Sequence, residues 1–302
     1  MIPDVQLLCV GLLADVSSAS SINHHNGKLY LIGDDSTTTV ILDTRYTLLD
    51  SLRLFNYPEE HIPKPVKIDL ETSSLVLVNG KLNLLCIGSG SRDPRKKVLR
   101  IPLSDSGLFD HNQSVEFIDV SEFIKRFASL GIDEINIEGS AQIGECFILA
   151  NRGTKTYPVN QFVVTDARFW NNPKKASLKS IQLMLSHDEK EFLGVSELCY
   201  VTSSDMLLLT ISTENTSNSY DDGEIGDSYI GWIKNISTKL NGVKLHLDGV
   251  INLSNASEEF EGQKIEGICV ESANDDNFLL HLVSDNDGSD GRIFNIELHW
   301  TI

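Results

Sequence analysis

The sequence lacks the runs and motifs that define several common functional classes. No stretch approaches the roughly 18 consecutive apolar residues of a membrane-spanning helix, and the first residues lack the Lys/Arg region of a secretory signal. There is no GxSxG motif, no phosphate-binding loop and no dinucleotide-binding glycine motif. These absences argue against a membrane protein, a serine hydrolase and a nucleotide-binding enzyme.

Basic residues are also scarce. The chain has 25 Lys and Arg against 43 Asp and Glu, a formal net charge of −18. Such a surface repels phosphate backbones and anionic lipids, so we expect no nucleic-acid or membrane partner. It attracts cations instead.

Cysteine is sparse and isolated. The five cysteines, Cys9, Cys86, Cys146, Cys199 and Cys269, each stand alone within an apolar run, without CxxC spacing. We expect buried free thiols and hence a reducing, cytoplasmic location. A periplasmic or exported location remains the alternative if a leader has been removed.

What the sequence does contain is a repeat. Five times a short apolar strand, a polar turn, a second apolar strand and a third strand follow one another. The copies span residues 21–42, 74–103, 138–166, 197–233 and 266–298. Repeats that cannot bury their own apolar faces indicate stacked sheets. We predict an all-β fold, a five-bladed β-propeller forming one domain over residues 1–302, with six blades as the alternative.

The register of the repeat is predicted from its turns. Ser21, Ser74 and Glu138 each stand six positions before a turn glycine, and we take them as starts of innermost strands. The fifth copy ends before an outer strand, so we predict that the N-terminal segment 5–13 completes the last blade and closes the ring.

Two further elements are predicted outside the repeat's inner strands. The apolar segment 243–253 is expected to form the outer strand of blade four. A helix is expected from Ser121, as N-cap, to Gly131. Its apolar face, with Phe123 and Phe127, forms either a lid or a cover over apolar blade edges.

The starts of the first strands and the ends of the second strands should meet around one mouth of the central channel. The predicted starts are Ser21, Ser74, Glu138, Glu197 and Glu266, and the predicted ends are Asp34, Ser89, Asn151, Glu214 and Asp285. Asp35, Arg152 and Asn286 follow these ends. So many oxygen donors fit Ca²⁺, which takes six to eight oxygen ligands. Alternatively, the Glu-Gly pairs are structural, with Glu accepting backbone N–H bonds and Gly allowing close strand packing.

Ligand-binding residues are predicted at the same mouth. Arg92 and Arg152 can hold an anion such as a phosphoester or carboxylate, opposite Asp34, Asp35, Glu214 and Asn286. Salt bridges to the acidic side are the alternative for these arginines. The acidic loops 213–224 and 284–291 are further candidates for cation binding.

Several strings carry a resemblance to known propellers. They are Ile-Gly-Asp-Asp from Ile32, Gly-Ser-Gly-Ser from Gly88, Asn-Ile-Glu-Gly from Asn136, Tyr-Asp-Asp-Gly-Glu from Tyr220, Ile-Glu-Gly from Ile265 and Ser-Asp-Asn-Asp-Gly from Ser284. With them the chain resembles a bacterial propeller family of unknown function and, more remotely, esterase-like phytases and the gluconolactonase/senescence-marker group. The remote resemblance implies a divalent metal in the mouth, with Glu138, Asn151, Glu266 and Asp285 as ligands. The chain departs from those groups by placing Ser at two strand starts.

The function expected from the sequence is binding of a small anionic ligand at the mouth, through Ca²⁺ where a metal is present. Two alternatives stay open. One is a metal-dependent phosphoesterase or lactonase-like hydrolase, in which the metal activates water or polarises the substrate. The other is a non-catalytic scaffold that binds a loop of a partner protein. We expect a monomer.

Overall fold

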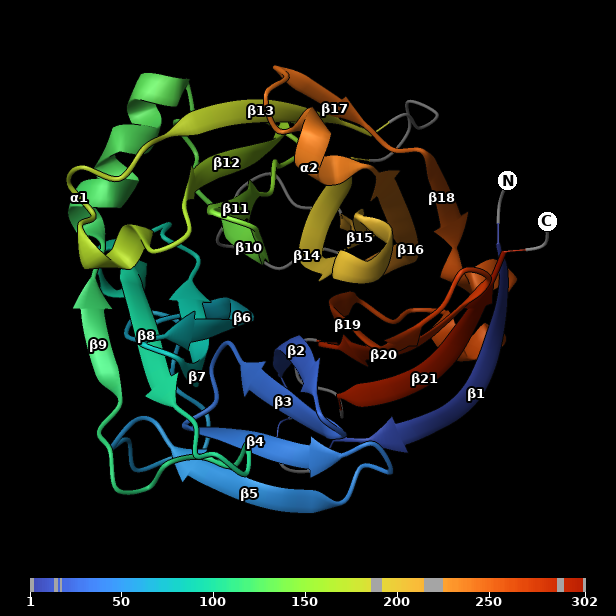
Figure 1. The fold of residues 1–302 in the computed structure, drawn as a ribbon, viewed down its shortest axis with the longest axis horizontal. Helices are drawn as coiled ribbons and strands as arrows, with labels where there is room; N and C mark the ends of the chain where they lie inside the picture. The colour runs from blue at the N-terminus through green and yellow to red at the C-terminus, as the bar shows by residue number, and fades with distance from the viewer. Residues whose placement is uncertain are drawn as a thin grey trace.

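Five sheets stand around a central axis in the computed structural model of the protein, which describes residues 3–13, 16, 18–185, 192–214, 225–286 and 291–300 (for Glu214, the backbone alone) (Figure 1). The predicted five-bladed propeller is confirmed. Each innermost strand contacts the innermost strands of the neighbouring blades, so these strands form a ring around the axis. No helix within the described ranges is long and apolar enough to cross a membrane.

The first three blades follow chain order from the axis outward. Blade one consists of β2 (Ala19–His25), β3 (Lys28–Gly33), β4 (Thr38–Asp43) and β5 (Leu48–Arg53). Blade two consists of β6 (Leu70–Val78), β7 (Lys81–Gly88), β8 (Lys97–Pro102) and β9 (Glu116–Asp119). Blade three begins with β10 (Ile137–Ile143), β11 (Cys146–Asn151), β12 (Asn160–Asp166) and β13 (Lys179–Met184).

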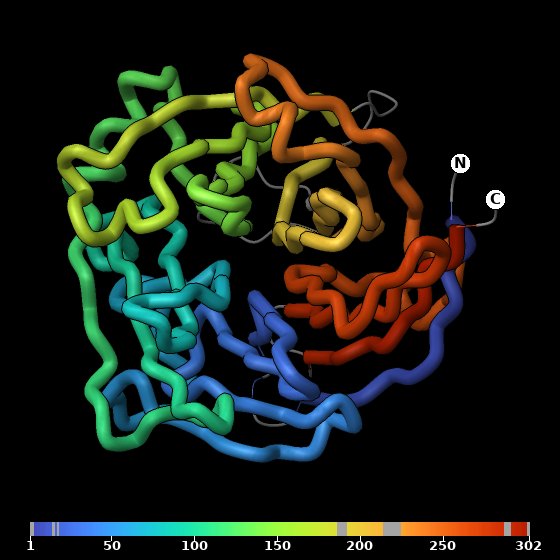
Figure 2. The backbone as a smooth tube through the Cα atoms, in the orientation of Figure 1, coloured from blue at the N-terminus to red at the C-terminus, as the bar shows by residue number. Residues whose placement is uncertain are grey.

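The last two blades contain the departures from simple chain order. Blade four consists of β14 (Leu193–Val201), β15 (Met206–Glu214), β16 (Ile225–Lys234) and β18 (Gly249–Asn252). Blade five consists of β19 (Ile265–Ala273), β20 (Asn277–Ser284), β21 (Arg292–His299) and, outermost, β1 (Asp4–Leu12). β1 pairs antiparallel with β21 along its whole length. The predicted closure of the ring by the N-terminal segment is therefore confirmed, and β1 and β21, from opposite ends of the sequence, lie side by side in this blade (Figure 2).

Apolar burial explains why no blade is a unit by itself. The buried apolar side chains of the described residues form five clusters, and each cluster lies between two neighbouring blades. A blade therefore buries both faces only when both neighbours are present. The cysteines are free, as predicted, but only Cys86 and Cys269 are buried. Cys146 and Cys199 are half-buried, and Cys9 is exposed because it lies on the outermost strand.

The predicted outer strand over residues 243–253 is wrong, because this segment forms two strands. β17 (Lys244–His246) pairs parallel with β13 and so extends blade three, whereas β18 pairs with β16 of blade four. Asp248 makes the corner between them: its backbone N–H donates to the Trp232 carbonyl at 2.8 Å, and its carboxylate accepts from the Lys234 N–H at 2.6 Å. Gly249 follows, where a Cβ would lie 2.0 Å from the Trp232 ring.

The predicted helix exists but begins differently. α1 (Ser121–Ile124) continues as 3-10 turns over Lys125–Leu130 and ends at Gly131, whose φ is +74°. Ser121 is not the N-cap; its N–H instead donates to the Asp119 side chain at 2.8 Å. Phe123 and Phe127 are fully buried in the cluster between blades two and three, which supports the covering role. A second short helix, α2 (Ile236–Lys239), follows β16.

Candidate metal centre at the channel mouth

A β-bulge lies near the start of every innermost strand. The pairing with the second strand shifts by one residue around Ser20, Glu71, Glu138 and Glu266, and around the pair Ser196 and Glu197 in blade four. A bulge inserts an extra residue and re-aims its side chain. In blades two, three and five the single bulged residue is a glutamate.

Glu71, Glu138 and Glu266 form a carboxylate cluster, hereafter the three-glutamate cluster. Each contributes one carboxylate oxygen, and these oxygens lie within 4.8 Å of one another. Glu138 and Glu266 are 8% and 4% exposed, and Glu71 is half-buried. Blades two, three and five therefore direct negative charge to one point at the mouth.

The neighbours of this cluster compensate its charge only in part. Asn136 donates to Glu138 Oε1 at 2.6 Å, and Arg152 lies 3.9 Å from Glu138 Oε2. Lys264 Nζ lies 3.1 Å from Glu266 Oε1, but outside hydrogen-bonding geometry, so that buried oxygen accepts no hydrogen bond. A buried carboxylate oxygen without a donor is energetically unfavourable unless it has another partner.

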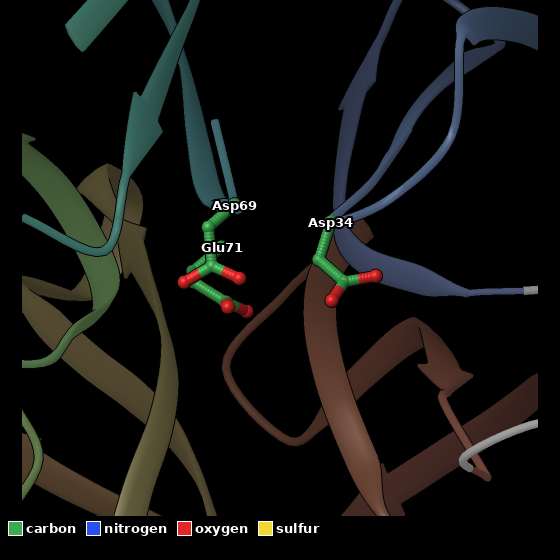
Figure 3. Close-up of side chains that lie close together, drawn as sticks. All are labelled: Asp34, Asp69 and Glu71. Carbon is green, nitrogen blue, oxygen red and sulfur yellow. The ribbon is translucent and has the colours of Figure 1, made fainter. Parts of the chain in front are cut away.

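A second cluster adjoins the first through Glu71. Asp34, at the end of β3, faces Asp69 and Glu71, at the start of β6 (Figure 3). Here the cations are built in: Lys67 bonds Asp34 and lies 2.8 Å from Asp69, and Arg95 donates to Asp69 at 2.5 Å. Asp34 and Asp69 are therefore already neutralised, and Glu71 is the carboxylate that both clusters share.

The protonation behaviour follows from this crowding. Burial, followed by the charges of Asp69, Glu138 and Asp34, raises the pKa of Glu71 well above its usual value. Burial also raises the pKa of Asp34 to about 6, against the opposing effect of Lys67. Carboxylates gathered without a cation are expected to behave in this way.

The structure brings only some of the predicted metal ligands together. Glu138 and Glu266 lie in the three-glutamate cluster. The Asn151 amide is occupied by backbone groups, accepting from Asn136 N–H at 2.9 Å and donating to Glu134 O at 3.2 Å. Asp285 donates its backbone N–H to Lys264 O at 3.0 Å and belongs to neither carboxylate cluster in the part of the chain that is described.

The predicted ligand-binding residues are dispersed. Asp34 lies in the second cluster, and Asp35 accepts from Ser18 Oγ at 2.5 Å and lies 3.1 Å from His61 Nδ1. Asn286 donates to Gln263 Oε1 at 2.8 Å and accepts from Lys264 N–H at 3.3 Å. The Glu214 side chain, most of loop 213–224 and residues 287–290 lie outside the described residues.

The two predicted anion-binding arginines differ in exposure. Arg152 is 4% exposed and donates to Ser196 Oγ at 2.9 Å and Ser212 Oγ at 3.0 Å, so it spans the junction of blades three and four. Arg92 is exposed in the loop between β7 and β8. Several nearby cations form salt bridges to acidic residues, among them Arg95 with Asp69 and Lys97 with Asp119.

Sequence reasoning missed Glu71, and the reason is a register error. The six-residue spacing before Gly80 places the start of blade two at Ser74, but β6 begins at Leu70 because its hairpin is longer than that of blade three. Leu70-Glu71 is the counterpart of Ile137-Glu138 and Ile265-Glu266. An aliphatic residue followed by glutamate was the signal that could have identified it.

Glu197 is also placed differently from the prediction. β14 begins at Leu193, so Glu197 is not a strand start; it lies further along the strand and is 1% exposed. It takes no part in either carboxylate cluster.

Comparison with known proteins supports the fold. A search of curated proteins found no match. Glutaminyl cyclase from Myxococcus xanthus is similar in structure, with a TM-score of 0.54, 13% identity and coverage of 99% of this chain and 98% of that one. An N-acetylgalactosamine deacetylase from F. plautii has a TM-score of 0.55, 10% identity and coverage of 99% and 94%. At such identities the likeness shows the fold alone. The profile of a family of unknown function, DUF6929, matches residues 15–298.

Proposed function

The chain belongs to the DUF6929 family, and we propose that it binds a divalent cation, Ca²⁺, at Glu71, Glu138 and Glu266, and a small anionic ligand through that cation. One observation carries the proposal: two buried carboxylates and one half-buried carboxylate, from three blades, offer oxygens within 4.8 Å of one another. The comparison shows a family of unknown function, and the structure shows the propeller. The cation and the ligand are our inference from the site.

The geometry of the cluster suits a large, hard cation. Ca²⁺ binds oxygen at about 2.3–2.6 Å, so two oxygens on one ion lie at most about 5 Å apart. The 4.8 Å limit on the three oxygens falls within that span. The Glu266 oxygen that accepts no hydrogen bond, and whose charge faces Lys264 Nζ at 3.1 Å, would gain a coordinating ion.

The anion follows from the coordination number. Three glutamates leave part of the six-to-eight-oxygen shell of Ca²⁺ to water or to a ligand, and oxygens of a carboxylate or phosphoester are the chemical match. Arg92, exposed in the loop between β7 and β8, is the cation that we assign to the outer end of such a ligand.

Thermal unfolding and calorimetry with Ca²⁺ test the proposal. Ligand at 100 times Kd stabilises the folded state by about 2.7 kcal/mol, so Ca²⁺ should raise the Tm of the wild type. Glu71→Gln and Glu266→Gln should abolish the increase. Glu145→Gln, an exposed site in the turn between β10 and β11 on the opposite face, is the matched control and should keep it.

Two results in the same experiments would contradict the proposal. If Ca²⁺, Mg²⁺ and Mn²⁺ produce neither heat of binding nor a Tm increase in the wild type, the cluster is not a cation site. A Tm increase that survives in Glu71→Gln and Glu266→Gln would place the ion elsewhere.

A further inference from the structure

The carboxylate of Glu197 joins four blades near the propeller axis. Oε2 accepts from Ser21 Oγ of β2 at 2.5 Å, and Oε1 accepts from Thr72 Oγ1 of β6 at 2.8 Å. Oε1 also accepts from two backbone N–H groups, those of Ser140 on β10 at 3.0 Å and of Leu198 on its own strand at 2.9 Å. Blades one, two and three are thus bonded to one side chain of blade four.

The hydroxyl groups around Glu197 extend this contact into a network. Ser21 and Ser73 lie 2.9 Å apart, Thr72 and Ser140 lie 2.8 Å apart, and Ser74 and Ser140 lie 2.9 Å apart. Glu197 forms no ion pair with any lysine, arginine or histidine among the residues that are described. Hydrogen bonds alone hold this buried carboxyl group, although glutamate is rarely fully buried without a charged partner.

The bonded residues stand directly beside the three-glutamate cluster in the sequence. Thr72 follows Glu71, and Ser140 is two residues after Glu138. Between the latter two, Gly139 brings β10 against the Glu197 backbone, where a Cβ would lie 3.1 Å from Glu197 Cα. The separation of Glu71 from Glu138 is therefore set by two strands that both bond to Glu197.

Blade five joins the same arrangement indirectly. Gly267, which follows Glu266, packs against the backbone of blade one, where its Cβ would lie 3.0 Å from Ile22 N. Ile22 follows Ser21, the hydroxyl donor to Glu197. All three glutamates are thus one or two residues from a contact that leads to Glu197.

We propose that Glu197 is the positioning residue of the cation site: its carboxyl group fixes the innermost strands of blades one, two and three, and thereby the spacing of Glu71, Glu138 and Glu266. The inference rests on the proposed function and adds a residue that does not touch the cation. It gives a role to a buried carboxyl group that does not belong to any of the apolar clusters between blades.

Three variants test it by Ca²⁺ calorimetry. Glu197→Gln keeps the shape and an acceptor oxygen, and its amide can donate to Ser21, so Ca²⁺ affinity should stay close to that of the wild type. Glu197→Ala removes all four bonds and should weaken binding by about tenfold or more, equivalent to about 1.4 kcal/mol. Ile181→Ala, a core truncation on β13 away from the axis, is the control for lost stability and should leave affinity unchanged.

Hydrogen exchange without any cation separates the inference from the function on which it rests. Glu197→Ala, and neither Glu197→Gln nor Ile181→Ala, should speed exchange in β6 and β10. If the wild type binds no cation, the proposed function fails, while this comparison still decides whether Glu197 fixes the strands.

Two results would overturn the inference. One is a folded Glu197→Ala protein with wild-type Ca²⁺ affinity or with unchanged exchange in β6 and β10. The other is a Glu197→Gln protein weakened as much as Glu197→Ala, since the charge of Glu197 and not its bonding geometry would then set the affinity.

Discussion

Two physical effects act in opposite directions on the pKa of Glu197. Burial raises its pKa to about 8, while hydrogen bonds from Ser21, Leu198, Ser140 and Thr72 act in the opposite direction. Burial prevails because removing a carboxylate from water is more unfavourable than these bonds are favourable. Glutamine at this position would imitate the shape of the protonated form.

This raised pKa predicts a pH dependence of stability. The group has a pKa of 4.5 in the unfolded chain and about 8 in the folded one, so the folded state holds the proton more tightly. The stability that it contributes is complete below pH 4.5 and is lost as pH rises through 8, by a few kcal/mol in order of magnitude. Glu197→Gln should flatten the decline in the free energy of unfolding across this window, as measured in urea. Equal slopes for both proteins would contradict the shift.

Gly139 gives a steric prediction beside the same residue. A Cβ there would lie 3.1 Å from the backbone atoms of Glu197, which cannot move aside as a flexible side chain does. We expect Gly139→Ala to lower the free energy of unfolding by about 1–3 kcal/mol. Gln142→Ala, an exposed change on the same strand, should stay within about 0.5 kcal/mol of the wild type in the same urea experiment. If Gly139→Ala leaves the free energy of unfolding unchanged, β10 and β14 can move apart at this contact without cost.

At the scale of elements, turn chemistry was the reliable signal. Asn26-Gly27 and Asn79-Gly80 both adopt positive φ at both residues, as tight hairpin turns require. These turns made the repeat visible and the five blades predictable. Strand length was not predictable from them, since the hairpin of β6 and β7 is longer than those of blades one and three and thereby hid Glu71.

The misread outer strand has a different cause. β17 and β18 both contain apolar residues, Leu245 in one and Val250 and Ile251 in the other, and nothing local distinguishes pairing with β13 from pairing with β16. The choice depends on the Trp232 ring against Gly249, a contact between distant residues. For the same reason the cations Lys67 and Lys264 could not be assigned to the mouth: each lies in a loop whose path only the assembled ring determines.

The junction of blades one and five carries a buried polar contact of its own. The turn between β4 and β5 holds Tyr46 at a φ of +69°, which is strained for a bulky residue. Its hydroxyl lies 3.1 Å from His281 Nδ1, and His281 Nε2 lies 2.8 Å from Glu271 Oε2. Because Glu271 accepts a hydrogen bond from Nε2–H, Nδ1 of the neutral ring is left to accept a hydrogen bond from the Tyr46 hydroxyl.

This contact predicts acid sensitivity. Burial lowers the pKa of His281 from 6.5, although the hydrogen bond to Glu271 opposes the shift. The stabilisation by the neutral ring is thus complete above pH 6.5 and is lost as pH falls below it towards the folded-state pKa. Tyr46→Phe should lower the free energy of unfolding by about 0.5–1.5 kcal/mol above pH 6.5, and His281→Gln should reduce the loss of stability below it. Urea unfolding on either side of pH 6.5 measures both; an unchanged loss in His281→Gln would assign the acid sensitivity to other groups.

For the whole molecule, closure of the ring is what makes the site. The three-glutamate cluster draws on blades two, three and five, and the apolar clusters hold each blade only through its neighbours. Opening the ring at any junction would therefore disperse charges that repel one another. The acidic mouth depends on the closed ring, because the apolar contacts between blades offset the repulsion among the carboxylates at the axis.

Removing β1 should test this dependence. Val5, Leu7 and Val10 pack against the cluster between blades four and five, and β1 covers the edge of β21. A chain beginning at residue 13 should lose stability on the order of 5 kcal/mol and lose any Ca²⁺-dependent increase in Tm, although no residue of the mouth has changed. A peptide of residues 3–13 supplied in trans should restore both by pairing with β21, whereas the same peptide with Leu7→Asp should not. If the shortened chain melts at the wild-type temperature, blade five is stable with three strands and ring closure is not what holds the mouth together.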